Sequence, residues 1–467
     1  MRINEGGLSH FFIPWSQYYI IMANANSSVP QTELPDWWQR EKQRRQLLFL
    51  VFLGAVLLLI GYFYWAASTA GVRVGVIDFD TTDYISFVRR EKDGNTTLYV
   101  MRADGSGLRR MTDAEDKSGK ETPVWTMDGS HLIYVSNRND PRTWQVYIVG
   151  GGEPSQLTYG TGNKSAPVVS PDGKRVAFIT QGAIKTMLPN GQDVYQLMPV
   201  PTAGEGAGEE GATRPNMDAA TSIRGPFRTV SLSSDGSGCA GVKELSGEES
   251  SEGSEIALGN QAAFVIPPGG DRSLVLDTGR EVGVAWEPNG KRLASAFAGL
   301  QERGASQKNL PASGIVLWNF ENPQKPQPQP VFVAAEHTVE PRNVAWAPDG
   351  SKIAFEVWRV KGEEDRKLLG IVVMAVSKNF GIRIDNAQQA DALGQSDRLM
   401  VKATPDARPQ RPLWSPDGTR LLYEVTRKDG KHDIWIINAD GTDPINLTNG
   451  EKDGTDNVQA SWSPRRK

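Results

Sequence analysis

The sequence predicts an all-β protein, a seven-bladed β-propeller closed by its C-terminal strand and preceded by one transmembrane helix. Three observations predict it. A Trp-Ser-Pro-Asp-Gly phrase returns along the chain, a second hairpin follows several copies, and the chain ends on a copy of the strand that precedes the phrase. A repeat of roughly 40 to 70 residues is typical of propellers and similar arrays, in which neighbouring units cover one another's apolar faces.

The phrase predicts a tight turn. Proline presets φ at the first corner, Asp tolerates the second, and glycine takes the positive φ that a side chain would oppose. We expect the Trp of each copy to pack between neighbouring sheets, and its Asp to form the turn rather than bind a ligand. The copies, of which the third is degraded and the last truncated, are Trp125–Gly129, Val169–Gly173, Leu232–Gly236, Trp286–Gly290, Trp346–Gly350, Trp414–Gly418 and Trp462–Pro464.

Each turn is followed by a short run of branched and aromatic residues that reads as a strand, such as Leu132–Val135 or Leu421–Glu424. A second hairpin comes next. In the last full unit it comprises Asp433–Asn438, the turn Ala439–Thr442 and Ile445–Thr448. Each unit is therefore predicted to be a four-stranded antiparallel meander, and radial stacking would cover both faces of each meander.

The two ends of the array complement each other. The chain enters at Tyr84–Val88, which matches the strand after the turn, so its own preceding strand is missing. Gln459–Pro464 is an inner strand with nothing after it. We therefore predict that the last strand completes the first blade and closes the ring. The count is seven blades, or six if the degraded copy at Leu232 is not a blade.

These motifs resemble the TolB-type, WD-repeat-like propeller family, which repeats the W-S-P-D-G turn, an I-x-Y/F strand and a hairpin ending near L-T. The resemblance covers about residues 78 to 467. It implies the propeller fold and says little about function, because propellers carry many unrelated activities. TolB has a small α/β domain before its propeller. This chain has a hydrophobic segment there, so we expect a membrane-anchored variant of the family that lacks this domain.

Residues 47–67 are 21 consecutive uncharged and mostly apolar positions, enough to span a bilayer as a helix. Arg40, Lys42, Arg44 and Arg45 precede this segment, whereas only Arg73 follows it within a comparable distance. The positive-inside rule then predicts a single-pass protein with a cytoplasmic N-terminus and a periplasmic or extracellular propeller. The expected organisation is a cytoplasmic segment at 1–46, a helix at 47–67, a linker at 68–80 and the propeller at 81–467.

Two alternatives concern the N-terminus. Ser68–Ala70 has the small-x-small pattern of a signal-peptidase site, but the apolar run is long for a signal peptide, which favours an uncleaved anchor. Met22 starts a more ordinary polar segment and is an alternative translation start. Three polar or proline-rich stretches, 200–225, 248–255 and Pro323–Pro330, are predicted to be surface loops.

The sequence holds no catalytic pattern that we would assign. It has no G-x-S-x-G elbow, no H-E-x-x-H and no Cys-x-x-Cys, and its four His residues are scattered. Its single cysteine, Cys239, excludes an intrachain disulfide and fits a small buried side chain. Asp78–Asp83 has alternating carboxylates but lacks the fuller calcium-loop pattern. We expect a protein that is not an enzyme, with no metal and no cofactor. A net charge of −4 without a basic cluster argues against nucleic-acid binding.

The axial mouth of the ring is the default place for a ligand. The position four residues before each Trp, or its equivalent, is expected to lie near the channel. The residues at this position are Glu121, Ser165, Arg228, Val282, Arg342, Gln410 and Val458. Arg411 directly follows Gln410 in the chain. The candidate ligand-binding residues are Glu121, Arg228, Arg342, Gln410 and Arg411. Converging arginines suit a carboxylate or a peptide terminus. Alternatively, they pair with Glu121, Glu281 or Glu340 and line water.

The sequence therefore predicts a non-catalytic scaffold in the cell envelope. It would contact membrane lipid through residues 47–67 and bind a protein partner, or a peptide or glycan. A first alternative is a transmembrane sensor that passes ligand binding to its short cytoplasmic segment. A second is a propeller hydrolase or lyase, which would need carboxylates, Tyr or His at the mouth. The aligned positions offer one Glu and no Tyr or His.

Overall fold

The computed structural model describes residues 83–113, 115–198, 227–244, 261–270, 273–276, 281–288, 290–298, 312–361, 365–377 and 381–464. These residues form seven sheets, which we call blades 1 to 7 in chain order. The first strand of each sheet contacts the first strand of the next, and the seventh contacts the first, so these inner strands form a closed ring. The prediction of an all-β, seven-bladed propeller is confirmed, and the degraded copy at Leu232 belongs to a true blade.

Blades 1 to 4 are four-stranded meanders. Blade 1 consists of β29 (Asp456–Trp462), β1 (Tyr84–Arg90), β2 (Thr96–Arg102) and β3 (Arg109–Arg110). Blade 2 consists of β4 (Lys120–Trp125), β5 (Leu132–Ser136), β6 (Gln145–Val149) and β7 (Ser155–Gln156). Blade 3 consists of β8 (Lys164–Val169), β9 (Val176–Thr180), β10 (Ala183–Met187) and β11 (Tyr195–Met198). Blade 4 consists of β12 (Phe227–Leu232), β13 (Cys239–Glu244), β14 (Gln261–Ile266) and β15 (Leu274–Leu276).

Blades 5 to 7 continue the pattern with one exchange between sheets. Blade 5 consists of β16 (Glu281–Trp286), β17 (Arg292–Ala298), β18 (Ser313–Asn319), β19 (Gln327–Ala334) and β23 (Ile382–Ile384). Blade 6 consists of β20 (Val339–Trp346), β21 (Lys352–Val360), β22 (Arg366–Ala375) and β24 (Leu399–Lys402). Blade 7 consists of β25 (Ala407–Trp414), β26 (Arg420–Arg427), β27 (His432–Asn438) and β28 (Ile445–Asn446). Strand β23 leaves the blade 6 meander, pairs in parallel with the outer edge of blade 5, and returns through helix α3 (Ala387–Leu393).

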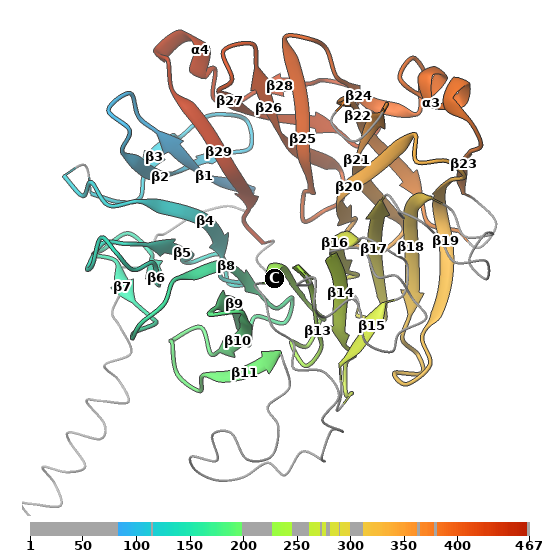
Figure 1. Ribbon diagram of the computed structural model, residues 1–467. Helices are drawn as coiled ribbons and strands as arrows, with labels where there is room; N and C mark the ends of the chain where they lie inside the picture. Colours follow the sequence, from blue (N-terminus) through green and yellow to red (C-terminus); the bar gives the residue numbers. More distant parts are fainter. Residues whose placement is uncertain are drawn as a thin grey trace, which may run out of the picture. The chain divides into compact units, whose positions relative to one another are not determined.

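The C-terminal strand closes the ring as predicted. Strand β29 lies antiparallel beside β1, with Trp462 opposite Ile85 and Val458 opposite Val88 (Figure 1). Just beyond the strand, Ser463 receives the Tyr84 backbone N–H on its Oγ at 2.9 Å and donates its own N–H to the Tyr84 carbonyl at 2.8 Å. The short helix α4 (Gly450–Asp453) leads the chain from blade 7 into this strand.

The Trp of the phrase packs between blades, which confirms its predicted role. Trp125, Trp286, Trp346 and Trp414 are all buried within hydrophobic clusters that join two consecutive blades. Three indoles also donate to the carbonyl of the preceding inner strand. Nε1 of Trp346 bonds to Ala285, that of Trp414 to Ala345, and that of Trp462 to Leu413, at 2.9, 3.2 and 3.3 Å. One residue thus supplies both apolar contact and a directional bond at these interfaces.

The Asp of the phrase forms the turn, also as predicted. Asp417 accepts the N–H of Thr419 at 3.0 Å and the hydroxyl of Ser415 at 2.6 Å. Burial raises the pKa of Asp417, but the hydrogen bonds from Ser415 and Thr419 outweigh it and lower the pKa to about 2. Asp172 and Asp235 make the same pair of bonds in blades 3 and 4. These side chains are therefore committed to local turn geometry.

One predicted loop is wrong in its second half. Gln327–Pro330, part of the expected loop Pro323–Pro330, belongs to β19 and pairs with β18, Pro328 opposite Trp318 and Pro330 opposite Val316. Strand β23 pairs only with Phe332–Ala334, so the first half of β19 is the edge of the sheet. Proline is tolerated at an edge because no further strand needs a backbone N–H from it. The predicted segments 1–46, 47–67 and 68–80 and the loops 200–225 and 248–255 lie outside the described residues. In the described ranges, no helix has the length and apolar character to cross a membrane.

Candidate functional site

The inner strands share a bulge at the position just after the aligned residues. The residue at the bulge has positive φ in five blades: Thr122, Ala166, Asn343, Arg411 and Gln459. In blade 6, for example, Arg342 lies opposite Glu356, and Ala345 lies opposite Ala354. Between these two pairs, two residues of β20 therefore face a single residue of β21. A bulge of this kind interrupts the ladder and re-aims backbone N–H groups. Those N–H groups are then available to side chains of the neighbouring blade.

Two buried glutamates accept these N–H groups across the blade boundaries. Glu356 of blade 6 accepts the N–H of Arg411 of blade 7 at 2.7 Å through its Oε1. Glu424 of blade 7 accepts the N–H of Gln459 of blade 1 at 2.7 Å in the same way. The Gln459 side chain in turn accepts the N–H of Thr122 of blade 2 at 2.8 Å. These three bonds to a carboxylate or amide oxygen therefore link four consecutive blades, which are blades 6, 7, 1 and 2.

The glutamates occupy a position that is apolar in other blades. Glu356 and Glu424 lie directly opposite Arg342 and Gln410, two of the candidate residues. The register places Val88, Val135 and Ile179 at the corresponding positions of blades 1, 2 and 3. Sequence reasoning missed these carboxylates, although the signal was present: their strand runs end in Glu where other copies have Val or Ile. Blades 6 and 7 therefore have a carboxylate at a position that is apolar in blades 1, 2 and 3.

A third buried acid, Glu340, organises the start of β20. Its Oε2 accepts Nε and Nη2 of Arg342 at 3.2 and 2.5 Å, and its Oε1 lies 3.3 Å from Nε of Arg366 and 3.0 Å from Nε2 of His337. Burial raises the pKa of Glu340, but the hydrogen bonds from His337 and Arg342, with the charges of Arg342 and Arg366, outweigh it and lower the pKa to about 2. Glu340 therefore stays ionised and fixes the surrounding cations.

Arg342 is held on a second side by an aromatic ring. Its guanidinium carbon lies 5.3 Å from the ring centroid of Trp358, within the range of a cation–π contact. The Trp358 indole donates to Glu356 Oε2 at 2.8 Å, and Asn343 Nδ2 donates to Glu356 Oε1 at 2.6 Å. The Arg342 side chain still exposes about a third of its surface, 33%. We call Glu340, Arg342, Glu356, Arg411 and Glu424 the polar cluster.

The structure brings together three of the five candidate residues. Arg342 pairs with Glu340, one of the two alternatives expected from sequence. Gln410 is half-buried and its Nε2 lies 3.4 Å from Thr426 Oγ1. Arg411 has 56% of its side chain exposed, and its Nη1 is 3.6 Å from Glu424 Oε1. Ligand binding by these residues stays a prediction.

The remaining aligned positions are dispersed around the ring. Glu121 is exposed on blade 2, opposite Val135. Arg228 belongs to β12 of blade 4, and its side chain lies outside the described residues. Ser165 is exposed and Val282 half-buried. Val458 is buried in the hydrophobic cluster between blades 1 and 2 and does not contribute a polar group.

The polar cluster suits recognition of an anion. The guanidinium of Arg342 is held by Glu340 and Trp358 and is 33% exposed. That of Arg411 is 56% exposed and lies 3.6 Å from Glu424. A guanidinium binds a carboxylate through two parallel bonds. The carboxylates of the cluster are hydrogen-bonded to cations or backbone N–H groups. In the described part of the chain, no three His, Cys, Asp or Glu side chains are grouped to hold a metal ion.

Comparisons with known proteins show similarity in fold. No protein-family model and no curated protein matches the chain. Solved structures that resemble it include an oligogalacturonate lyase in complex with manganese, with 12% identity, 78% of this chain and 85% of that chain covered, and a TM-score of 0.45. TolB from Acinetobacter baumannii has 14% identity, coverage of 82% and 83%, and a TM-score of 0.40. A puromycin-hydrolyzing peptidase from Mycobacterium tuberculosis has 14% identity, coverage of 82% and 54%, and a TM-score of 0.44. The neighbours include both enzymes and TolB, and we transfer no activity from them.

Proposed function

We propose that this chain is a membrane-anchored propeller outside the cytoplasm that acts as a non-catalytic binding scaffold. The observation that carries the binding role is the polar cluster. Its carboxylates Glu356 and Glu424 accept backbone N–H groups from the next blade, while the guanidinium groups of Arg342 and Arg411 remain partly exposed. Binding sites gain affinity when their groups are ordered before the ligand arrives. The ligand that fits these donors is a carboxylate, such as a peptide C-terminus or an acidic side chain.

The state of the acids supports a non-catalytic role. A general acid at neutral pH needs a raised pKa. The pKa of Glu340 is lowered to about 2, and Glu356 and Glu424 each accept a backbone N–H from the next blade. These carboxylates are thus engaged as fixed acceptors within the protein. The membrane anchor rests on the apolar run 47–67 and its basic N-terminal flank.

A crosslinking experiment tests the binding role. The full chain is expressed in its membrane with a tag, crosslinked in situ, solubilised in mild detergent and purified, and the copurifying proteins are quantified. The Arg411→Gln variant is compared with Arg408→Gln, because both arginines are exposed on β25 and only Arg411 lies at the bulge. We expect a partner that is retained by Arg408→Gln and lost with Arg411→Gln. Equal recovery from both variants contradicts the assignment of the polar cluster.

Protease protection tests the proposed topology separately. In intact cells with a permeabilised outer layer, added protease should reach the propeller and leave a tag at residue 1 protected. Extraction with carbonate should leave the full chain in the membrane fraction. Release by carbonate, or protection of the propeller, would overturn the membrane part of the proposal and leave the binding role open to its own test.

A further inference from the structure

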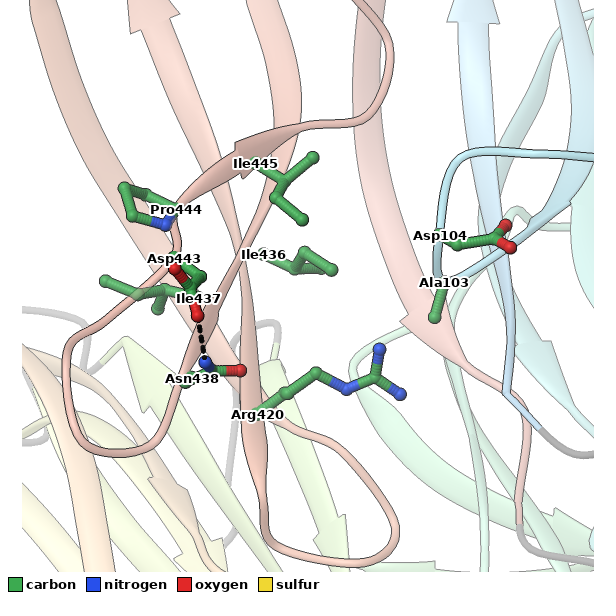
Figure 2. A pocket seen from close by; sticks show the side chains of 9 residues that line it. All are labelled: Ala103, Asp104, Arg420, Ile436, Ile437, Asn438, Asp443, Pro444 and Ile445. Atoms are coloured by element: carbon green, nitrogen blue, oxygen red, sulfur yellow. Dashed lines mark hydrogen bonds between the residues drawn. The ribbon is translucent and has the colours of Figure 1, made fainter.

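The seam where the ring closes contains a cavity. It has a volume of about 530 Å³ and lies between blade 7 and the β2–β3 hairpin of blade 1 (Figure 2). The hairpin approaches blade 7 closely, because a Cβ atom added to Gly105 would lie 3.6 Å from Cδ2 of Leu447. The cavity is separate from the polar cluster, since the two share no residue.

One wall of the cavity is apolar. Ile436 and Ile445 come from β27 and β28, and Ala103 faces them from the hairpin (Figure 2). Ile445 is 46% exposed, so part of this apolar wall is in contact with water. The small side chain of Ala103 leaves the space open. Burying a chain of methylene groups against Ile445 would remove apolar surface from water and is favourable.

The charged groups of the cavity give it a negative balance. Arg420 lies at its base, but its Nη2 is 3.1 Å from Asp83 Oδ2, and its guanidinium carbon is 5.4 Å from the Trp462 ring centroid. Asp104 accepts the N–H of Ser106, and the hydrogen bonds from Ser106 lower the pKa of Asp104, so it is ionised at neutral pH. Two carboxylates, those of Asp104 and Asp443, line the cavity. Among the described residues of the lining, the one cationic group, the Arg420 guanidinium, is already paired with Asp83.

Asp443 has spare capacity for a cation. Its Oδ2 accepts Nδ2 of Asn438 at 3.0 Å, and among the described residues no cationic side chain forms an ion pair with it. Asp443 follows the hairpin turn with φ of 52°, a conformation that Asp and Asn adopt more readily than most residues. Its carboxylate and the isoleucine wall together offer an acidic end and an aliphatic side.

We propose that this seam cavity binds the side chain of a lysine or arginine presented by a partner protein. The aliphatic stem lies along Ile445 and Ile436, and the ammonium or guanidinium group contacts Asp443. Long basic side chains commonly bury their stems while their charge stays near water and a carboxylate. The inference rests on the proposed scaffold function, because it names the chemistry of a partner.

Four small probes test the cavity directly. They are the Nα-acetyl methylamides of lysine, arginine, norleucine and glutamate, titrated against the full chain in detergent micelles by saturation-transfer NMR. Norleucine matches the length of the lysine stem without its charge. We expect lysine and arginine to bind more tightly than norleucine, and glutamate to bind weakest. The Asp443→Asn variant should weaken lysine binding about three- to fivefold, as expected for a partly exposed ion pair, and leave norleucine binding unchanged.

Asp440→Asn is the matched control, because Asp440 is in the same hairpin and does not line the cavity. Asn keeps the turn-forming acceptor at both positions. Equal affinity for lysine and norleucine, tighter binding of glutamate, or equal effects of Asp443→Asn and Asp440→Asn would each overturn the proposal, as would absence of binding by all four probes. If the probe experiment fails while the Arg411→Gln variant still loses its partner in the crosslinking experiment, the proposal for the seam cavity is rejected and the proposed scaffold function stands.

Discussion

Glu424 on the second strand of blade 7 accepts the backbone N–H of Gln459 at 2.7 Å, on the strand that completes blade 1. The two residues lie on opposite sides of the seam between blades 7 and 1. A buried carboxylate therefore satisfies a backbone donor that the bulge at Gln459 removes from the sheet ladder. The same arrangement joins Glu356 to Arg411 one blade earlier.

Replacing Glu424 should weaken the seam. Glu424→Leu leaves the Gln459 N–H without its acceptor, and we expect a loss of about 1 to 2 kcal/mol in the free energy of unfolding. Glu424→Gln keeps a carbonyl oxygen at the same place and should cost less. Urea unfolding followed by Trp fluorescence measures both. Glu121→Gln, at an exposed position, serves as the control and should change little. A Glu424→Leu protein as stable as wild type would show that the bond contributes nothing.

A disulfide across β1 and β29 should lock the ring. Ser86 and Ser461 are register partners whose hydroxyl oxygens lie 3.0 Å apart. In the Ser86→Cys/Ser461→Cys variant we expect a bond that links the two ends of the propeller and stabilises it by about 4 kcal/mol through the long enclosed loop. Cys239 should not compete, because it is fully buried and burial raises its pKa to about 12.

The readout for this disulfide is the unfolding midpoint with and without reductant, together with electrophoretic mobility. Reductant should remove the gain, and the single variant Ser86→Cys should show none. Intermolecular dimers in place of the internal bond would contradict the proposed closure.

The loss of folding stability at acidic pH should depend on Glu340. Its folded pKa is about 2 against an ordinary value of 4.5, so the unfolded chain binds more protons between these values. The contribution is therefore complete above about pH 5 and is lost as pH falls toward 2; its size is on the order of 3 kcal/mol. Urea unfolding at several pH values should show a steeper loss below pH 5 in wild type than in Glu340→Gln. Parallel curves for the two proteins would assign the acid sensitivity elsewhere.

The turn of the clearest repeat should tolerate Asn better than Ala at its glycine. Gly418 has φ of 71°, and a Cβ added there would meet Cδ of Pro348 at an ordinary 3.6 Å. Space is thus available, and the cost of Gly418→Ala arises from the backbone, about 1 to 2 kcal/mol. Gly418→Asn should cost less because Asn visits this region more easily. Thermal unfolding compares the variants; equal losses for Ala and Asn would point to crowding.

Local chemistry explains how far the sequence predicts the fold. The Ser-Pro-Asp-Gly turn is specified within a few residues, because Asp417 bonds to Ser415 and Thr419 beside it. Six copies of this turn, a truncated seventh copy and an incomplete unit at each end were enough to predict the blades and the pairing of Trp462 with the strand of Ile85. The wrong prediction of a loop at Gln327–Pro330 arises because this segment depends on tertiary context and not on adjacent residues. Proline is compatible with β19 only because that half of the strand is an edge, which neighbouring residues do not reveal.

The sequence by itself determined the repeated unit and predicted the closure of the ring, because turns and strand periodicity depend on adjacent residues. It left six or seven blades open, and the sheet that contains Leu232 decides for seven. The tertiary structure decided which side chains meet. Glu356 reaches the N–H of Arg411 only because a bulge turns that group toward the preceding blade. Ala103 and Ile445 share a cavity only because the last strand brings blade 7 against blade 1. Such contacts depend on how rigid sheets pack around the ring, and packing joins residues that no local pattern connects.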